Sequence, residues 1–220
     1  MELLDIIENE GVIAIVRGVY RKECERLCEA LLAGGIRLVE VTFDQSDPSM
    51  WIETQKAISR IAEVFEGRIR PGAGTVTSTR LAEAAMAAGA RYVISPDVNP
   101  EVIERTKELG LISIPGALTP TEIAAARRHG ADIVKLFPAG ELGCGYLKAV
   151  KAPLSDAKLM AVGGVNADNA GQFVKAGAVG VGVGGSLVDK NRIRSGDFDS
   201  LTKEAERLVA AVKAAKEDKK

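Results

Sequence analysis

Residues 119–136 read TPTEIAAARRHGADIVKL and contain one complete helix-to-strand unit. Thr119 is a helix-capping residue type, Pro120 suits the first helical position, and Glu122 completes a capping box. Gly130 can adopt the left-handed conformation that ends a helix. The largely apolar residues 133–136 that follow predict a short strand buried on both faces. This stretch therefore predicts a helix that leads into a strand of a parallel sheet.

The same unit recurs along the chain. Helical stretches rich in alanine and charged residues end at Gly35, Gly67, Gly89, Gly110, Gly130 and Gly177, and each glycine precedes a short apolar run. Capping residues before a proline also mark helix starts at Asp47-Pro48 and Asn99-Pro100. Eight strands are predicted, at Val12–Val16, Leu38–Thr42, Ile69–Gly72, Tyr92–Ser95, Ile112–Ile114, Ile133–Leu136, Leu159–Val162 and Val179–Val183.

Eight strand–helix units within about 200 to 250 residues are typical of an α/β protein with a TIM (β/α)8 barrel. An open doubly wound sheet is the alternative, although that fold rarely needs eight regular units. At about 150 residues per domain, we expect one domain over residues 1–220. It would have an N-terminal helix at about 1–10, a C-terminal helix at about 199–216 and a polar tail at 217–220.

The composition excludes several kinds of partner. Lys and Arg number 29 and Asp and Glu number 30, and the net charge of -1 argues against a nucleic-acid or membrane surface. The acidic start lacks a secretory signal, and no apolar run approaches the roughly 18 residues of a membrane span. Cys24 and Cys28 are too widely spaced on a helix for a disulfide. We therefore expect a reduced, cytoplasmic protein, and with 1 histidine no metal site.

Two charged side chains are predicted to point into the barrel. Successive strand residues face alternately outward and inward. In residues 38–43 (LVEVTF) the apolar valine and phenylalanine face suits the helix layer, so Glu40 points inward. The same alternation in residues 133–137 (IVKLF) sends Lys135 inward. Apolar surroundings should lower the pKa of that lysine and make its amine nucleophilic.

Glu40 and Lys135 are therefore candidate catalytic residues. A desolvated amine can condense with a ketone to an imine, and a nearby carboxylate can move protons. The alternative is structural: the two residues could form a buried ion pair, or Lys135 could extend past the strand end to solvent.

Two glycine-rich turns follow the seventh and eighth predicted strands. They read VGGVN at 162–166 and VGGSL at 183–187, and both lead into helical segments. Backbone N–H groups in such turns can bind an anion, and barrels often bind phosphate there. Arg17, at the end of the first strand, could add a bidentate contact. A purely structural use of these glycines in tight turns is the alternative.

Taken together, these residues resemble the 2-keto-3-deoxy-6-phosphogluconate (KDPG) aldolases, a family that includes the 4-hydroxy-2-oxoglutarate (KHG) aldolases. The resemblance extends over about Leu4 to Asp189. The matching stretches are VIAIVR (12–17), EVTF (40–43), GAGTV (72–76), ISP (94–96), PGALTPTE (115–122), VKLFPA (134–139), GGV (163–165) and GGS (184–186).

The resemblance implies a metal-independent class I aldolase without a cofactor, built as a trimer of TIM barrels. Such an enzyme cleaves a phosphorylated 2-keto-3-deoxy sugar acid, or a related 4-hydroxy-2-keto acid, to pyruvate and an aldehyde. By the same resemblance, Lys135 lies at the position of the Schiff-base lysine and Glu40 at that of the general acid/base. Thr75 would hold the pyruvate carboxylate and Phe137 would pack beside the reacting carbons. The phosphate would be bound by Arg17 with Gly164, Gly185 and Ser186, and Gly163 would be a further substrate-binding residue.

The sequence departs from the family pattern at two positions. Many members carry an arginine four residues after the catalytic glutamate, where it binds the keto-acid carboxylate, but this chain has Asp44. Val162 stands where the family has a threonine before the two glycines. Both departures concern the substrate and leave Lys135 and Glu40 in place.

Two other functions stay open from the sequence alone. On the same barrel Glu40 could move a proton in a sugar-phosphate isomerase or epimerase, with Lys135 as an electrostatic partner. Alternatively, Asp44 and Val162 could mark a non-catalytic relative that only binds a phosphorylated metabolite. Trp51 and Tyr92 are interpreted as packing groups.

Overall fold

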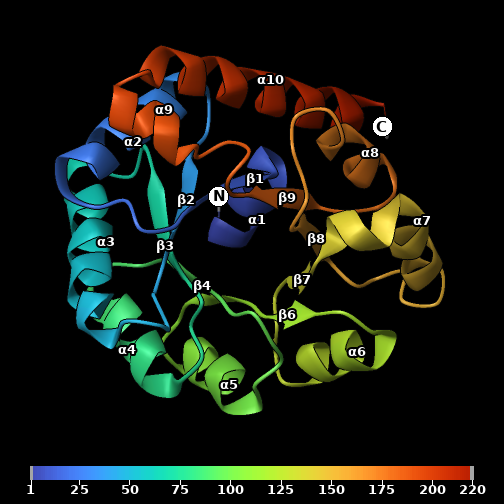
Figure 1. Ribbon diagram of the computed structural model, residues 1–220. Helices are drawn as coiled ribbons and strands as arrows, with labels where there is room; N and C mark the ends of the chain where they lie inside the picture. Colours follow the sequence, from blue (N-terminus) through green and yellow to red (C-terminus); the bar gives the residue numbers. More distant parts are fainter. Residues whose placement is uncertain (1, 219–220) are drawn as a thin grey trace.

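The computed structural model describes residues 2–218 and contains a barrel of parallel strands surrounded by helices (Figure 1). The strands are β1 (Val12–Val16), β2 (Leu38–Thr42), β3 (Arg70–Gly74), β4 (Tyr92–Ile94), β5 (Ile112–Ile114), β6 (Gly116–Ala117), β7 (Val134–Leu136), β8 (Leu159–Val162) and β9 (Gly180–Val183). Their order is β5-β4-β3-β2-β1-β9-β8-β7-β6, and their pairings are parallel. The predicted TIM barrel is confirmed.

The described residues form nine strands where the sequence predicts eight, because the fifth barrel strand is divided at Pro115. Proline has no N–H to donate to a ladder. Its carbonyl still accepts a hydrogen bond from the Lys135 amide at 2.9 Å, so the ladder continues past the break. β5 pairs with β4 and β6 pairs with β7. Since a single residue separates β5 from β6, the two ends of the sheet order meet there.

Helices alternate with the strands and, apart from α1, form the outer ring (Figure 1). They are α1 (Leu3–Glu10), α2 (Arg21–Ala33), the 3-10 turn η1 (Pro48–Met50), α3 (Trp51–Phe65), α4 (Thr79–Ala87), α5 (Pro100–Glu108), α6 (Pro120–Arg128), α7 (Ala139–Lys151), α8 (Ala170–Lys175), α9 (Lys190–Ser195) and α10 (Phe198–Glu217). Thr119 and Glu122 form the predicted capping box of α6, and Asn99 caps α5. Asp47 caps η1 instead of an α-helix, since its carboxylate accepts from the Ser49 amide.

The six glycines expected to end helices all have positive φ, between 73° at Gly110 and 120° at Gly177. Left-handed backbone is costly for a residue with a Cβ, which explains the use of glycine there. The prediction that these glycines end the helices of the repeat is therefore confirmed.

Two apolar clusters on opposite sides of the strands form the core. The larger cluster joins the outward strand residues, such as Val39, Val41 and Phe43, to the helices. The smaller cluster fills the barrel interior and includes Ile13, Leu38, Tyr92, Ile114, Ile133 and Met160. This division follows the predicted alternation, because Leu38 shares its inward direction with Glu40, and Ile133 shares it with Lys135.

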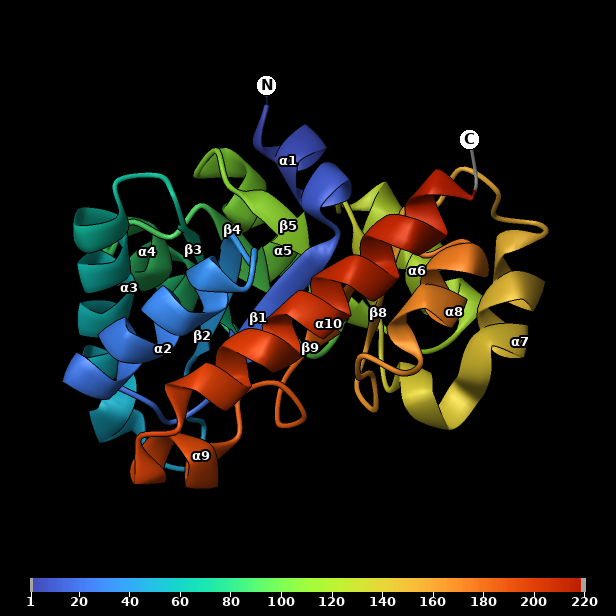
Figure 2. The same ribbon diagram turned by 90° about the horizontal axis from the view of Figure 1, so that it is seen from above.

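The α1 helix closes one end of the barrel. Figure 2 shows it at the end opposite α9, and its Ile7 is fully buried in the interior cluster. α10 packs along the outside, where Leu201, Leu208 and Val212 join the larger cluster. Of the tail expected at 217–220, Glu217 is the last residue of α10 and residues 219–220 lie outside the described part.

None of the helices within residues 2–218 combines the length and apolar character needed to cross a bilayer.

Candidate active site

A cavity of about 420 Å³ lies at the carboxyl ends of the strands. All nine residues predicted for the site line it: Arg17, Glu40, Thr75, Lys135, Phe137, Gly163, Gly164, Gly185 and Ser186. They come from β1, β2, β3, β7, β8 and β9 or from the turns that follow these strands. The structure therefore brings together residues that are up to 169 positions apart in the chain, from Arg17 to Ser186.

Glu40 lies at the inner wall of this cavity and is only 2% exposed. β3 makes room for it, because a Cβ on Gly74 would lie 1.6 Å from Glu40 Oε1. Burial raises the pKa of Glu40 to about 7, although the positive charges of Lys135 and Arg17 act in the opposite direction. Near neutral pH, this carboxyl can therefore both accept and release a proton.

Lys135 is half-buried and faces Glu40 across the barrel from β7. Burial lowers its pKa, the negative charge of Glu40 raises it, and Arg17 lowers it further. Its Nζ lies 4.6 Å from the centre of the Phe137 ring. The ion pairs found among residues 2–218, all with N–O distances up to 4.0 Å, do not include Lys135 with Glu40.

This arrangement argues against the structural alternative. A buried structural ion pair would hold the amine and the carboxylate in contact, with both charges satisfied. Here the two groups are separate, and both line a cavity that opens to solvent. An amine with a lowered pKa and a carboxyl with a raised pKa are the pair that imine chemistry with proton transfer requires.

The two glycine-rich turns lie side by side at the mouth of the cavity. The Ser186 hydroxyl, after β9, donates to the Val165 carbonyl, after β8, at 3.0 Å. Gly163 and Gly164 have φ of 87° and 72°, and a Cβ on Gly163 would lie 2.9 Å from the Phe137 ring. Within residues 2–218, the amides of Gly164, Gly185 and Ser186 donate to no carbonyl. These N–H groups are available to an anion.

Arg17 and Thr75 meet at the same opening. Arg17 Nη2 donates to Thr75 Oγ1 at 3.4 Å. β1 pairs with β9, which places Arg17 beside the Ser186 turn as predicted. Thr75 has a φ of 56°, an unusual value for a threonine. Its carbonyl accepts a hydrogen bond from Gln45 Nε2 at 3.0 Å, which ties down the loop after β2.

The two departures from the family pattern have different surroundings. Asp44 does not line the cavity. Its carboxylate accepts hydrogen bonds from the amide and the hydroxyl of Ser46 at 2.9 and 2.6 Å, and these bonds lower its pKa. Val162 does line the cavity and is 4% exposed. Its side chain therefore makes one wall of the opening apolar.

Some residues of the site were not singled out from the sequence. The cavity is also lined by Ile15, Pro96 and Gly182, and by Val165, Asn166 and Gly184 of the two glycine-rich turns in which an anion site is predicted. Ile15 and Gly182 have the inward direction of their strands, so the alternation that identified Glu40 could have found them. Pro96 and Asn166 lie in loops, where alternation gives no direction.

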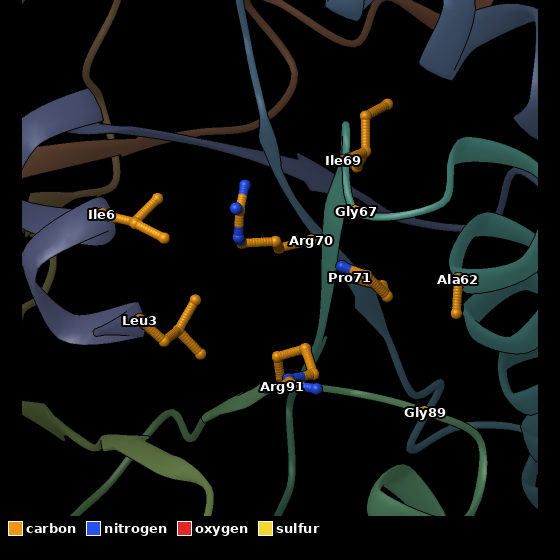
Figure 3. A pocket seen from close by; sticks show the side chains of 9 residues that line it. All are labelled: Leu3, Ile6, Ala62, Gly67, Ile69, Arg70, Pro71, Gly89 and Arg91. Carbon is orange, nitrogen blue, oxygen red and sulfur yellow. The ribbon is translucent and has the colours of Figure 1, made fainter. Parts of the chain in front are cut away.

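The other end of the barrel has a separate cavity of about 500 Å³ between α1 and the starts of β3 and β4. Figure 3 shows Leu3 and Ile6 of α1 facing Arg70 of β3, whereas Pro71 lies on the other side of the strand. The residues that line it include none of the nine predicted for the site and no carboxylate. Its lining therefore lacks the acid–amine pair found at the carboxyl ends of the strands.

Comparison with known proteins gives the same family as the sequence resemblance. A family model described as "KDPG and KHG aldolase" matches residues 4–204. The 2-dehydro-3-deoxy-6-phosphogalactonate aldolase of Escherichia coli (strain K12) is 33% identical over 207 residues, which cover 94% of this chain and 95% of the relative. The 2-dehydro-3-deoxy-phosphogluconate aldolase of Treponema pallidum (strain Nichols) is 33% identical over 204 residues, 91% of this chain and 92% of the relative.

Solved structures agree with these matches. A structure described as native KDPGal has a TM-score of 0.84 and 31% identity, and the match covers 94% of this chain and 96% of that one. A KDPG aldolase from Legionella pneumophila, with pyruvate captured as a covalent carbinolamine, has a TM-score of 0.82 and 26% identity over 94% and 98% of the two chains. The fold, the length and the sequence all match, and the chain belongs to the KDPG and KHG aldolase family.

Proposed function

We propose that this protein is a class I aldolase that cleaves a 2-keto-3-deoxy-6-phospho sugar acid, or a related 4-hydroxy-2-keto acid, to pyruvate and an aldehyde. One observation carries the proposal: the amine of Lys135 and the carboxyl of Glu40 line the same cavity without pairing, and burial moves the pKa of each toward neutrality. The named relatives act on phosphorylated gluconate and galactonate derivatives, which supports this substrate class.

The reaction begins with the neutral amine of Lys135. Its nitrogen adds to the C2 carbonyl of the substrate, and the protonated Glu40 carboxyl gives its proton to the resulting hydroxyl. Loss of water then leaves a protonated imine and the Glu40 carboxylate. The Glu40 carboxylate then removes the proton of the C4 hydroxyl. The C3–C4 bond breaks, its electron pair enters the imine to form an enamine, and the aldehyde leaves. Glu40 returns the proton to C3, and water hydrolyses the imine to release pyruvate and the free lysine.

The remaining site residues bind the substrate in this proposal. Arg17 and the free amides of Gly164, Gly185 and Ser186 take the phosphate, with Gly163 providing the turn. Thr75 takes the keto-acid carboxylate, and the Phe137 ring packs beside the reacting carbons. Asp44 is held by Ser46 outside the cavity lining, so its carboxylate is not in direct contact with the bound substrate in this proposal.

We also propose that residues 1–220 form a single aldolase domain that works as a cytoplasmic homotrimer, as the family resemblance implies. Ile52 and Met86, which are 51% and 42% exposed on the neighbouring helices α3 and α4, support an apolar contact between subunits. Sedimentation equilibrium tests this directly, and a monomer at micromolar concentration would contradict the trimer.

Borohydride trapping tests the proposed chemistry. Incubation with pyruvate and borohydride should attach one pyruvate-derived group to Lys135, located by peptide mass spectrometry. Lys135→Ala should abolish the adduct, and an unchanged circular dichroism spectrum would show that the fold is kept. Absence of an adduct at saturating pyruvate would contradict the proposal, and isomerase activity without an adduct would favour the epimerase alternative. A retro-aldol assay on phosphorylated and unphosphorylated 2-keto-3-deoxy acids then identifies the substrate.

A further inference from the structure

The barrel interior below the active site holds polar atoms without partners. Within residues 2–218, Glu40 Oε2, Thr42 Oγ1 and the Tyr92 hydroxyl are buried and make no hydrogen bond to the protein. Buried polar groups of this kind are rare in native proteins, and each calls for an explanation. All three belong to the strands that flank β3, since Glu40 and Thr42 are on β2 and Tyr92 is on β4.

Two glycines of β3 bring Tyr92 and Glu40 next to each other. A Cβ on Gly72 would lie 2.1 Å from Cε2 and 2.4 Å from Cζ of Tyr92, and a Cβ on Gly74 would lie 1.6 Å from Oε1 of Glu40. These glycines are consecutive inward positions of one strand, about 6.6 Å apart at the usual rise of ~3.3 Å per residue. The tyrosine ring therefore forms the layer directly beneath the Glu40 carboxyl, on the side of α1.

The hydroxyl of Tyr92 is not needed for packing. The ring is surrounded by the apolar interior cluster, which includes Ile7, Ile13, Ile94 and Ile114. A phenylalanine would fill the same space without burying an unpaired polar atom. Burial, and secondly the charge of Glu40, raise the pKa of Tyr92 well above its ordinary value. Tyr92 is therefore a neutral hydrogen-bond donor at every pH at which the enzyme works.

We propose that Tyr92 is a positioning residue for Glu40: its O–H donates a hydrogen bond toward Oε2 from the barrel floor, directly or through one interior water, while the carboxyl works on the substrate above. This inference deepens the proposed aldolase function and rests on it for the role of Glu40. A donor to the charged form favours the carboxylate over the acid. Tyr92 therefore offsets part of the effect of burial and keeps Glu40 able to act as a base near neutral pH.

The other groups that act on this pair are few. Lys135 from β7 and Arg17 from the end of β1 act on Glu40. On Tyr92, besides Glu40, the Cys28 thiol of α2 acts from the helix layer. None of these three is altered when the tyrosine hydroxyl alone is removed, so Tyr92→Phe isolates the proposed hydrogen bond.

The test uses deuterium exchange into the methyl group of pyruvate, followed by proton NMR. Exchange needs the Lys135 imine and a base that removes a C3 proton, but no aldehyde. Tyr92→Phe should move the pH midpoint of the exchange rate upward by about one unit, a tenfold change in the acid–base equilibrium of Glu40. Tyr20→Phe, which removes a hydroxyl outside the cavity lining, should leave the midpoint unchanged. Borohydride trapping of pyruvate should be unaffected in both variants.

Infrared titration of the free enzyme separates this inference from the proposed function. The carboxylic acid band that disappears in Glu40→Gln belongs to Glu40, and its midpoint can be read in the wild type and in Tyr92→Phe without any substrate. A higher midpoint of the Glu40 band in Tyr92→Phe supports the inference even if the wild type does not trap pyruvate. Failure to trap pyruvate would contradict only the proposed aldolase function. If the wild type and Tyr92→Phe have the same midpoint in the infrared titration and the same midpoint in the exchange experiment, while pyruvate trapping is intact, the proposed role of Tyr92 is overturned.

Discussion

At the scale of single residues, the site depends on one carboxyl and one amine that burial has shifted toward neutrality. Glu40 is 2% exposed and has a pKa of about 7, while Lys135 is half-buried and has a lowered pKa. Strand alternation predicted both residues, since each is a charged side chain in an inward position. The direction of the Lys135 shift was predicted as well, because desolvation disfavours a charged amine.

The raised pKa of Glu40 makes the free energy of unfolding depend on pH. Between about pH 4.5 and 7 the folded protein keeps a proton that the unfolded chain has released, so stability falls as the pH rises through this window. Glu40→Gln cannot titrate. Relative to the wild type, its free energy of unfolding should therefore rise by about 3 kcal/mol between pH 4.5 and pH 8. Urea unfolding at several pH values measures this difference, and a constant difference would contradict the raised pKa.

Arg17 is expected to contribute to phosphate binding and not to imine formation. Removing a charge-assisted contact of this kind costs roughly 1.5–3 kcal/mol, so Arg17→Ala should raise KM for a phosphorylated substrate about 10- to 100-fold. Pyruvate trapping at Lys135 should persist. Arg60→Ala is a matched control, because that arginine pairs with Glu25 on the helix layer and does not line the cavity. An unchanged KM in Arg17→Ala would place the phosphate elsewhere.

At the scale of secondary-structure elements, β3 contributes to the site mainly through its glycines, which have no side chain to fill the barrel interior. Gly72 and Gly74 leave the space that Tyr92 and Glu40 occupy. β3 ends at Gly74, two residues beyond the end predicted at Gly72, so the second of these glycines is paired with Thr42. A glycine in a strand often marks the close approach of another group, and here that group is the Glu40 carboxyl.

Gly74→Ala should therefore damage the site more than the fold. The new methyl group would overlap the Glu40 carboxyl and force it out of position, and loss of a positioned general base typically lowers a rate by about 10² to 10⁴. Methyl exchange of pyruvate should fall by a factor in this range while the protein stays folded. Gly145→Ala in α7 is the control, because nothing lies within 4 Å of its Cβ position. Equal exchange rates in the two variants would contradict this function of β3.

At the scale of the whole molecule, the two ends of the barrel differ: a helix covers one end, and the other end opens into a cavity. α1 covers the amino ends of the strands, and the interior cluster connects Ile7 to the layer of Tyr92 (Figure 2). The open end holds Glu40, Lys135 and the two glycine-rich turns. The candidate active site and the covered end thus lie at opposite ends of the barrel, as is usual for this fold.

Ile7→Ala tests the contribution of the closed end. Ile7 is fully buried, and removing most of such a side chain costs about 2–5 kcal/mol because it loses apolar contacts and leaves a cavity. Thermal unfolding should show this loss, whereas pyruvate trapping at Lys135, measured well below the unfolding temperature, should be retained. A loss of trapping without a loss of stability would show that the two ends are coupled.

Local signals in the sequence are enough to predict the repeat, the barrel, the inward direction of Glu40 and Lys135, and the adjacent glycine-rich turns. Caps, left-handed glycines and alternation act within a few residues of the chain.

The folded barrel was needed to show which side chains from different strands meet. It placed Tyr92, interpreted from the sequence as a packing group, beneath Glu40, and it joined the two turns through Ser186 and Val165. It also divided the fifth strand at Pro115 and showed Glu40 and Lys135 lining one cavity without an ion pair. Alternation gives a direction from one strand, but contacts across the barrel depend on the register and tilt of all the strands together.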